Sequence, residues 1–272
     1  MELIEPRVPL VTAFSANKGG VGKTRQAILT ANCLGAAGKR VLVIDMDFNN
    51  SATFYYLPDD KAGAAREKNI ADALAKESNL LSDYVLPTGH SGVDLLASSR
   101  YLADLRSINE KRLSRMLPAL AGKYDLVIID CQPDYNNLTL NALNASSLII
   151  TPVLKDLDSF NAAVFLGQKI ALDTDKQDRW YITINGYNRH YEEAVGGKQK
   201  EYIDVYRSEF LRTTDPETWF PWTVDMNEIK DRKKKLSDVP LRGEICNPEL
   251  YNAVVRLSEF IMQEPFEKPE AF

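Results

Sequence analysis

The segment Val8–Leu34, with the sequence VPLVTAFSANKGGVGKTRQAILTANCL, decides the fold of this chain. An apolar run leads into a glycine-rich turn, and the turn leads into a stretch whose apolar residues recur at helical spacing. Within the turn, Gly22, Lys23 and Thr24 match the end of the phosphate-loop pattern G-x-x-x-x-G-K-[ST]. Asn17 stands where that pattern opens with glycine, and Lys18 is a second lysine that it does not require. The order of strand, glycine turn and helix predicts a loop that binds phosphate.

The chemistry of such a loop follows from its residue types. Glycines let the backbone wrap around a phosphate with no Cβ in the way, and the N–H groups at the helix start point at the anion. We expect the Lys23 ammonium to reach the β- and γ-phosphates and the Thr24 hydroxyl to ligate Mg²⁺. A glycine turn without a ligand is the alternative, and the Lys-Thr pair after a strand argues against it.

Further apolar runs recur along the chain with helix-like segments between them. Several of them, such as RVLVID and DLVIID, are continuous rather than alternating, which is typical of strands buried on both faces of a parallel sheet. The predicted strands are Val8–Ala16, Arg40–Asp45, Val93–Ala97, Leu126–Asp130, Leu148–Val153, Trp180–Asn185 and, more weakly, Trp219–Val224. The pattern predicts an α/β fold with a doubly wound, mostly parallel sheet flanked by helices.

Local signals place the ends of two helices and the extent of the domain. The helix after Lys23 should end at Gly38, and a later helix should begin at an Asn109 N-cap and bend at Pro118. Because the first strand begins near residue 8 and no linker interrupts the chain, we expect residues 1–272 to form a single domain without an N-terminal DNA-binding extension.

Composition narrows the class of protein. The chain has 272 residues with 44% hydrophobic and 26% charged side chains, as an ordinary globular protein does. Its three cysteines show no disulfide or metal-ligand spacing, no signal peptide opens the chain, and no apolar window approaches the length of a membrane span. We therefore expect a cytoplasmic protein. A net charge of −5 argues against a protein that coats nucleic acid through its whole surface.

Carboxylates follow two of the predicted buried strands. Asp45 and Asp47 end one strand, and Asp130 ends another. Ligands of α/β proteins bind at the carboxyl ends of parallel strands, where an aspartate can hold Mg²⁺ through water. Each acid alone could cap a strand end or form an ion pair. Three such acids in a chain that also has a phosphate-binding loop indicate an active site. We expect Asp45 and Asp130 to join Thr24 at the metal.

The loop Lys18–Thr24 resembles the deviant Walker A motif of the ParA/MinD ATPases, which partition DNA or position other cargo. The resemblance implies that Lys18 crosses the interface of an ATP-bound homodimer and contacts the partner's phosphates. It also implies that Asp47 of the Asp45-Met46-Asp47 segment positions the attacking water and that Asp130 is the Walker B acid. Lys18, Lys23 and Asp47 are thus the expected catalytic residues. The implied nucleotide-binding residues are Lys18, Gly19, Gly20, Val21, Gly22, Lys23, Thr24, Arg25, Asn185 and Pro221.

Two segments depart from the pattern of that family. After Asp47 the family commonly has Pro-Gln-Gly-Asn, whereas this chain has Phe48–Ser51, followed by a matching Ala52-Thr53. Gln132 replaces the first proline of the Cys-Pro-Pro run after the Walker B acid. Both segments are the switches that sense the γ-phosphate in the family. The departures therefore concern the rate of hydrolysis and the activating partner rather than nucleotide binding.

A basic patch near the C-terminus suggests a nucleic-acid partner. Between residues 230 and 242 there are six basic and two acidic side chains, the basic ones being Lys230, Arg232, Lys233, Lys234, Lys235 and Arg242. A solvated helix face is the alternative. In ParA-like proteins this part of the chain binds nonspecific DNA once the dimer forms, which would place the protein on the nucleoid. A ParB-like centromere-binding protein or another cargo adaptor is the partner that the resemblance implies.

The sequence leaves other functions to weigh. A MinD-like membrane ATPase should end in a basic amphipathic helix, but from residue 243 onward there are six acidic and two basic side chains. We expect the helix around Leu250–Ile261 to pack on the core instead, with no membrane partner. Iron–sulfur reductases of the superfamily would need cysteine ligands, and bacterial tyrosine kinases a tyrosine-rich tail. The chain shows neither pattern.

Overall fold

The computed structural model describes residues 7–57, 62–76, 80–187, 201, 204–206, 212–221 and 248–269. The strands are β1 (Leu10–Phe14), β2 (Val41–Met46), β3 (Leu86–Pro87), β4 (Val93–Leu96), β5 (Leu126–Cys131), β6 (Leu148–Val153), β7 (Trp180–Tyr187) and β8 (Phe220–Pro221). The α-helices are α1 (Lys23–Ala36), α2 (Ser51–Tyr56), α3 (Ala62–Glu67), α4 (Ile70–Ala75), α5 (Arg112–Met116), α6 (Asn137–Ala145), α7 (Leu157–Asp173) and α11 (Pro248–Met262). Short 3₁₀ helices are η2 (Leu81–Tyr84), η3 (Arg100–Leu105), η4 (Leu117–Leu120), η5 (Gln177–Arg179) and η6 (Pro216–Thr218).

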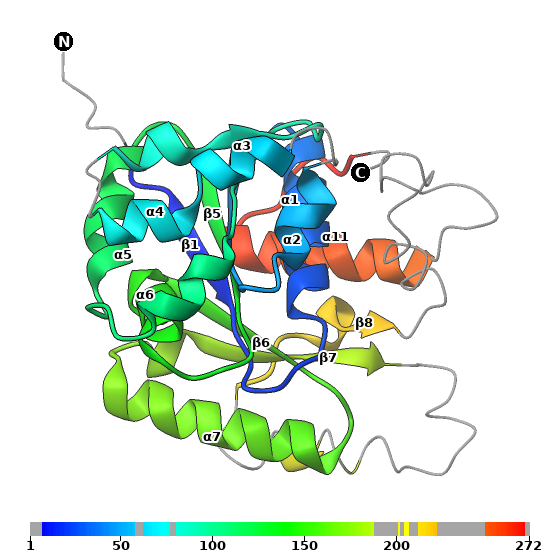
Figure 1. Ribbon diagram of the computed structural model, residues 1–272. Helices are drawn as coiled ribbons and strands as arrows, with labels where there is room; N and C mark the ends of the chain where they lie inside the picture. The colour runs from blue at the N-terminus through cyan, green and yellow to red at the C-terminus, as the bar shows by residue number, and fades with distance from the viewer. Residues whose placement is uncertain are drawn as a thin grey trace.

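The strands form one sheet in the order β3-β4-β2-β5-β1-β6-β7-β8. All neighbours pair in parallel except β3, which runs antiparallel to β4. The chain crosses from one half of the sheet to the other between β5 and β6, so that β1 lies between them at the centre (Figure 1). This order confirms the doubly wound, mostly parallel sheet and brings the carboxyl ends of β1, β2 and β5 together at one edge.

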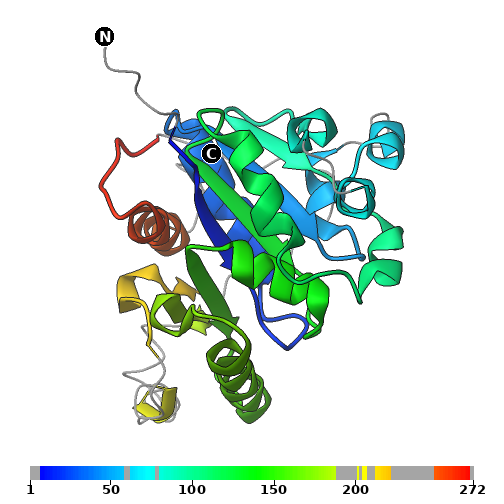
Figure 2. The same cartoon turned by 90° about the vertical axis from the view of Figure 1, so that its left-hand side faces the viewer.

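Each face of the sheet is covered by helices, which explains the continuous apolar runs. Successive side chains of a strand point to opposite faces, so Leu42 and Ile44 enter one core and Val41 and Val43 the other. The first core lies under α4, α5, α6 and α7, and the second under α1, α2 and α11. In Figure 2 the red helix α11 and the green helices lie on opposite sides of the blue strand β1.

Most of the sequence-based boundaries hold, and the differences have local causes. Gly38 adopts φ 81° just after α1, as expected of a helix-ending glycine. Pro118 ends the regular helix α5, and the chain continues as the 3₁₀ helix η4. The prediction of Asn109 as N-cap was wrong: Lys111 occupies that position, and the Asn109 side chain accepts a hydrogen bond from the Lys111 N–H at 3.0 Å.

The C-terminal helix α11 packs on the core, as its sequence predicted. Val254, Leu257 and Ile261 are buried in the second core, in contact with α1. Because this apolar face is already buried, it is not left to bind lipid. Among the described residues, no helix combines the length and the hydropathy of a membrane span.

Candidate active site

The loop between β1 and α1 has the backbone of an anion cradle. Gly20 and Gly22 adopt φ angles of 76° and 100°, in the left-handed region that only glycine occupies without strain. Gly22 is the N-cap of α1, and no described side chain caps the first turn. The N–H groups of that turn therefore keep their hydrogen-bonding capacity for an anion, which the helix dipole also favours.

Asn185, at the carboxyl end of β7, supports the loop from the neighbouring half of the sheet. Its Nδ2 donates a hydrogen bond to the Val21 carbonyl at 2.8 Å, and its Oδ1 accepts one from Gly186 N at 3.0 Å. A Cβ at Gly22 would lie 2.2 Å from this Nδ2, so the contact itself requires glycine there. Pro221 lies on the adjacent strand β8, beside β7. The two residues expected at the base are thus brought together next to the loop, and their contact with adenine stays a prediction.

Lys23 extends along the loop and is almost completely buried. Its Nζ donates a hydrogen bond to the Lys18 carbonyl at 3.1 Å. Burial lowers the pKa of Lys23, and the negative charge of Asp130 acts in the opposite direction. A buried ammonium whose one acceptor among the described residues is neutral gains from additional negative charge, and the loop in front of it is shaped to hold such a charge.

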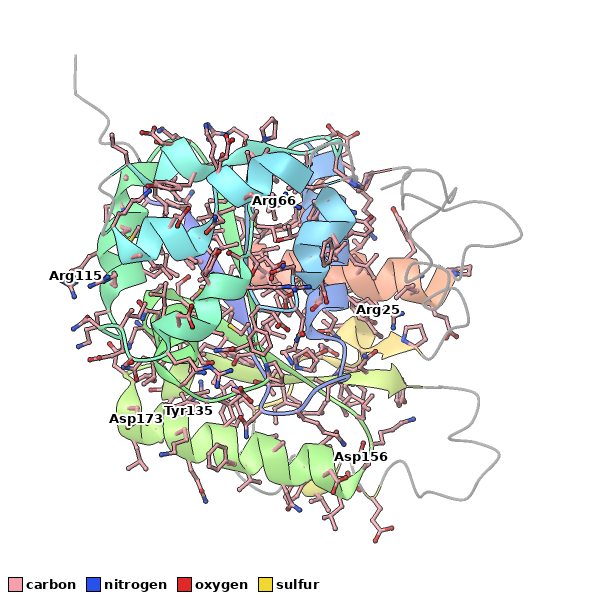
Figure 3. The ribbon with its side chains drawn as sticks, in the orientation of Figure 1. Arg25, Arg66, Arg115, Tyr135, Asp156 and Asp173 are labelled. Atoms are coloured by element: carbon pink, nitrogen blue, oxygen red, sulfur yellow. The ribbon has the colours of Figure 1, made fainter. Side chains whose placement is uncertain are left out.

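Lys18 points away from the loop and binds the start of α7. Its Nζ lies 2.6 Å from Asp156 Oδ1 and 4.0 Å from Asp158 Oδ2. Asp156, which Figure 3 labels at one end of α7, is also the N-cap of this helix, because its Oδ1 accepts a hydrogen bond from Ser159 N at 2.8 Å. Partial burial raises the pKa of Asp156, but the hydrogen bonds from Lys18 and Ser159 and the charge of Lys18 together outweigh it and hold the pKa below its ordinary value. Lys18 therefore has a partner within its own subunit.

Asp45 organises the segment after β2 through its buried carboxylate. Its Oδ2 accepts hydrogen bonds from Thr53 N and Thr53 Oγ1, both at 2.8 Å, and its Oδ1 accepts one from Asp47 N at 3.1 Å. Burial raises the pKa of Asp45 to about 6, against the effect of these hydrogen bonds. Ser98, at the end of β4, completes the network by donating its Oγ to the Asp47 carbonyl at 2.7 Å. Both carboxylate oxygens of Asp45 thus already accept hydrogen bonds from groups of the protein itself.

Asp47 is oriented by the residues that depart from the family pattern. Its Oδ1 accepts hydrogen bonds from the backbone N and the Nδ2 of Asn49, both at 2.9 Å. Asn50 then adopts φ 59° as the N-cap of α2, a left-handed conformation that asparagine tolerates better than most residues. The Phe48–Ser51 segment therefore fixes one oxygen of Asp47, and no described residue donates to the other, Oδ2.

Asp130 is fully buried beside Asp45, and its carboxylate has no well-aligned donor among the described residues. The two residues are register partners on the parallel strands β5 and β2. No described residue donates a hydrogen bond to either oxygen of Asp130 in good geometry. Burial, and next the charge of Asp45, raise the pKa of Asp130 well above its ordinary value, while the Thr24 hydroxyl acts against them. Two orphaned acceptor oxygens on a buried acid are costly without a ligand.

The expected metal residues Thr24, Asp45 and Asp130 are neighbours without forming a finished cage. Thr24 and Asp130 interact across the loop, and Asp45 stands beside Asp130. No group of three or more His, Cys, Asp or Glu side chains in the described part of the chain is arranged to hold a metal ion. That donor set suits Mg²⁺, which keeps several waters and needs only one or two carboxylates plus phosphate oxygens. Arg25 lies next to the site, and burial lowers its pKa to about 10.

The segment after Asp130 is tied to the other end of α7. The Tyr135 hydroxyl donates to Asp173 Oδ2 at 2.8 Å (Figure 3). Burial and this carboxylate raise the pKa of Tyr135. Since Asp156 holds Lys18 at the start of α7 and Asp173 holds Tyr135 at its end, one helix contacts both the loop lysine and the segment that follows the Walker B position.

The expectations for the basic patch, the cysteines and the partner of Lys18 have different outcomes. The basic patch of Lys230 to Arg242 lies outside the described residues. Cys33 and Cys131 are buried free thiols, as expected of structural cysteines, and burial raises the pKa of Cys33 to about 12. The sequence did not reveal Asp156 as the partner of Lys18. The sequence could have predicted Asp156 as a helix N-cap, because an aspartate stands three residues before Ser159. No local pattern predicts its contact with Lys18, which is 138 residues away in the sequence.

Comparison with known proteins identifies the family. A family model described as an AAA domain matches residues 10–173. The sporulation initiation inhibitor protein Soj of Bacillus subtilis (strain 168) is 35% identical over 149 residues, which are 53% of this chain and 57% of that protein. The alignment thus spans little more than half of the Bacillus protein. The chromosome-partitioning ATPase Soj of Treponema pallidum (strain Nichols) is 31% identical over 236 residues, which are 85% of this chain and 86% of that protein.

The fold has a close counterpart among solved structures. A putative plasmid partition protein from Borrelia burgdorferi B31, bound to AMPPNP, superposes with a TM-score of 0.74. It covers 94% of this chain and 99% of its own at 20% identity, so this likeness shows the fold alone. The family model, by contrast, matches more than half of the chain, and the Treponema protein aligns over most of both lengths. The chain belongs to the family of ParA-type partition ATPases.

Proposed function

We propose that this chain hydrolyses ATP and that the nucleotide switches it between a monomer and a DNA-bound dimer that positions a cargo. The observation that carries the proposal is that the two lysines of the loop lie in different environments. Lys23 is buried in the cradle, whereas Lys18 is held outside it by Asp156. A loop lysine that is not aimed at its own phosphate site is suited to act on a neighbouring one.

The residues of the site fit a triphosphate with Mg²⁺. The left-handed Gly20 and Gly22 leave space and N–H donors for phosphate oxygens, and Lys23 supplies a buried positive charge. The orphaned oxygens of Asp130 can accept hydrogen bonds from the waters around a hydrated Mg²⁺, and Thr24 can ligate the ion. When bound there, Mg²⁺ neutralises charge on the phosphates. Nucleotide binding would thus satisfy groups that the structure leaves unpaired.

Asp47 is the group that orients the attacking water in this proposal. Asn49 holds its Oδ1, so the carboxylate cannot rotate freely, and Asp47 follows β2 at the sheet edge where Asp130 ends the register of β5 with Asp45. Phosphoryl transfer to water needs mainly placement and charge neutralisation, which one fixed carboxylate and two lysines can supply. The departures at Phe48–Ser51 therefore still leave an oriented acid in place.

The dimer follows from the position of Lys18. Displacing its ammonium from Asp156 exposes a cation at the rim of the loop, where a second subunit can receive it. The complete set of phosphate contacts then exists only in the dimer, much as with an arginine finger supplied by a partner. The ion pair is partly exposed, with side-chain exposures of 27% and 39%, so we expect it to hold Lys18 by only about 0.2–1 kcal/mol.

DNA and a cargo adaptor are the partners of this dimer. The basic residues between Lys230 and Arg242 would neutralise phosphates without reading the sequence. Two copies of the patch in a dimer raise the affinity by avidity, which accounts for DNA binding by an acidic protein only in its ATP state. A ParB-like protein that stimulates hydrolysis would release the dimer from the nucleoid. The cargo is the DNA or other assembly to which that adaptor is bound.

The experiment that tests this function is a DNA-binding titration of the purified chain without nucleotide, with ADP and with a non-hydrolysable ATP analogue. We expect binding to random-sequence DNA only with the ATP analogue. A variant with Lys233, Lys234 and Lys235 changed to Glu should lose that binding while still dimerising. Because several phosphate contacts act together, raising the salt from about 50 to 200 mM should weaken binding by about 10³-fold or more for six contacts.

The matched control changes charges elsewhere on the surface. Substituting Lys76, Lys123 and Lys176 with Glu alters the net charge by the same amount at positions outside residues 230–242 and should leave DNA binding largely intact. Equal loss in both triple variants would mean that net charge, not the patch, decides binding. A dimer that ignores DNA under all conditions would contradict the DNA part of the proposal.

A further inference from the structure

Gln132 lies at the active-site edge of the sheet with half of its amide unused. It follows β5 directly and is 1% exposed. Its Nε2 donates a hydrogen bond to Asn136 Oδ1 at 2.9 Å. Its Oε1 is buried, and no described residue donates to it. An acceptor left unsatisfied inside a protein destabilises it, so this oxygen is suited to a donor that arrives with the ligand.

The orientation of the Gln132 amide follows from its neighbour. Asn136 is the N-cap of α6, and its Oδ1 accepts hydrogen bonds from Leu138 N at 2.9 Å and Thr139 N at 3.3 Å. This oxygen can only accept, so the group that Gln132 presents to it must be the NH₂. Turning the amide over would set two acceptor oxygens against each other. The unused carbonyl oxygen is therefore held away from Asn136.

The strand register sets Gln132 beside Asp47. In the parallel pair of β2 and β5, Asp45 is the partner of Asp130 and Met46 the partner of Cys131. The next residue of each strand is Asp47 on one side and Gln132 on the other. Both leave the sheet at the edge where the loop and the buried Asp130 lie, and the charge of Asp47 is felt by Lys23 and by Asp130. Asp47 and Gln132 thus flank the same position.

We propose that the Gln132 carbonyl oxygen accepts a hydrogen bond from the attacking water and so acts with Asp47 as a second catalytic residue. The inference rests on the ATPase activity proposed above and deepens it. A water molecule has two O–H donors, and Asp47 Oδ2 and Gln132 Oε1 are two acceptors without described donors. Engaging both O–H groups turns a lone pair of the water oxygen toward the γ-phosphate.

The hydrolysis step balances with these groups alone. The water oxygen forms a bond to the γ-phosphorus, and the bond from that phosphorus to the β–γ bridging oxygen breaks. Its electron pair leaves with ADP. One proton of the water passes by way of the Asp47 carboxylate to the released phosphate, and the other stays on the new phosphate oxygen. Gln132 remains neutral throughout, since an amide only accepts the hydrogen bond.

A purely structural role would use only the other half of the amide. In that case Gln132 would serve to steady the Asn136 cap of α6, and its loss would weaken folding and nucleotide binding together. The two roles separate in kinetics, because a water-orienting acceptor affects the chemical step without affecting the affinity for nucleotide. The test therefore needs the hydrolysis rate, the nucleotide affinity and the melting temperature of each variant.

The experiment uses the full chain and compares three variants with the wild type. Gln132→Met keeps the side-chain volume and removes both hydrogen-bonding atoms. Asn136→Ser keeps a good helix cap but removes the tether to Gln132. Asn137→Ala, also in α6, removes a 2.8 Å hydrogen bond from its Nδ2 to the Ile108 carbonyl and serves as the control outside the site. Single-turnover hydrolysis of saturating Mg-ATP is measured beside titration with a fluorescent ATP analogue and thermal melting.

We expect Gln132→Met to lower the single-turnover rate at least about tenfold, with nucleotide affinity within about twofold of the wild type. Asn136→Ser should lose less than about threefold, and Asn137→Ala should hydrolyse at the wild-type rate. An unchanged rate for Gln132→Met, or equal losses of rate and affinity in Gln132→Met and Asn136→Ser, would overturn the inference alone. A wild-type chain that binds ATP without hydrolysing it would overturn the proposed ATPase activity and this inference with it.

Discussion

Lys18→Ala is expected to abolish ATP-dependent dimerisation and to lower ATP hydrolysis by about 10³-fold or more, the effect of losing a cation supplied by a partner. Nucleotide binding by the monomer should persist, because Lys23 and the glycine cradle are intact and Lys18 is directed at Asp156 instead. Light scattering with a non-hydrolysable ATP analogue measures the dimer, a fluorescent ATP analogue measures binding, and phosphate release measures turnover.

Asp156→Asn is the counterpart of this variant and should act in the opposite direction. Asparagine caps a helix as well as aspartate does, so α7 keeps its first turn while Lys18 loses its carboxylate partner. Because the pair is partly exposed and weak, we expect the ATP dimer to form at about two- to tenfold lower protein concentration. A Lys18→Ala protein that still dimerises and turns over ATP would show that the lysine acts within its own subunit or not at all.

Asp130→Asn is expected to remove the stabilisation of the protein by Mg-ATP and to raise the stability of the nucleotide-free protein near neutral pH. The carboxylate is buried without a well-aligned donor among the described residues, and burial raises its pKa. Above about pH 4 the unfolded chain releases this proton while the folded chain retains it, so stability falls as pH rises through the folded pKa. The amide cannot ionise and avoids that cost. Melting curves with and without Mg-ATP measure both effects.

The size and the pH dependence of the gain identify its origin. We expect a gain of about 1 kcal/mol, or roughly 2–4 °C in melting temperature, near neutral pH, and none below about pH 3, where both states are protonated. Asp125→Asn is the matched control, since Asp125 precedes the same strand but pairs with Arg40 at the surface. That variant should retain the Mg-ATP stabilisation. A nucleotide-free Asp130→Asn protein less stable than the wild type at neutral pH would contradict the assignment of a ligand-dependent buried charge.

The fold could be predicted from the sequence because local and global signals agree. Continuous runs such as Val41–Asp45 are buried on both faces, and the glycine turn can only join a strand to a helix at the phosphate edge. The edge strand was harder to place. The predicted run Trp219–Val224 contains β8 (Phe220–Pro221), and its residues 222–224 lie outside the described part of the chain. Its signal was weak because an edge strand lacks the two-sided burial that makes the central strands recognisable in the sequence.

The candidate site was predictable where a motif fixes both residue and spacing, and not where contacts are long-range. Lys23, Asp45 and Asp130 were predicted from strand ends and loop spacing, and the parallel register of β2 and β5 confirms that Asp45 and Asp130 are neighbours. The pairing of Lys18 with Asp156 depends on how α7 docks, and no local pattern encodes it. Gln132 looked like a departure from a proline run. Its buried, oriented amide became evident only from the cap that Asn136 provides to α6.

The central claim, that ATP converts this chain from a monomer into a dimer, is tested most directly by its mass in solution. Light scattering of the purified chain should give the mass of one 30.6 kDa chain with ADP and of two chains with a non-hydrolysable ATP analogue and Mg²⁺. The dimer should revert when the analogue is exchanged for ADP. The same mass in both nucleotide states, whether of one chain or of two, would contradict the account, because Lys18 would then have no nucleotide-controlled partner to reach.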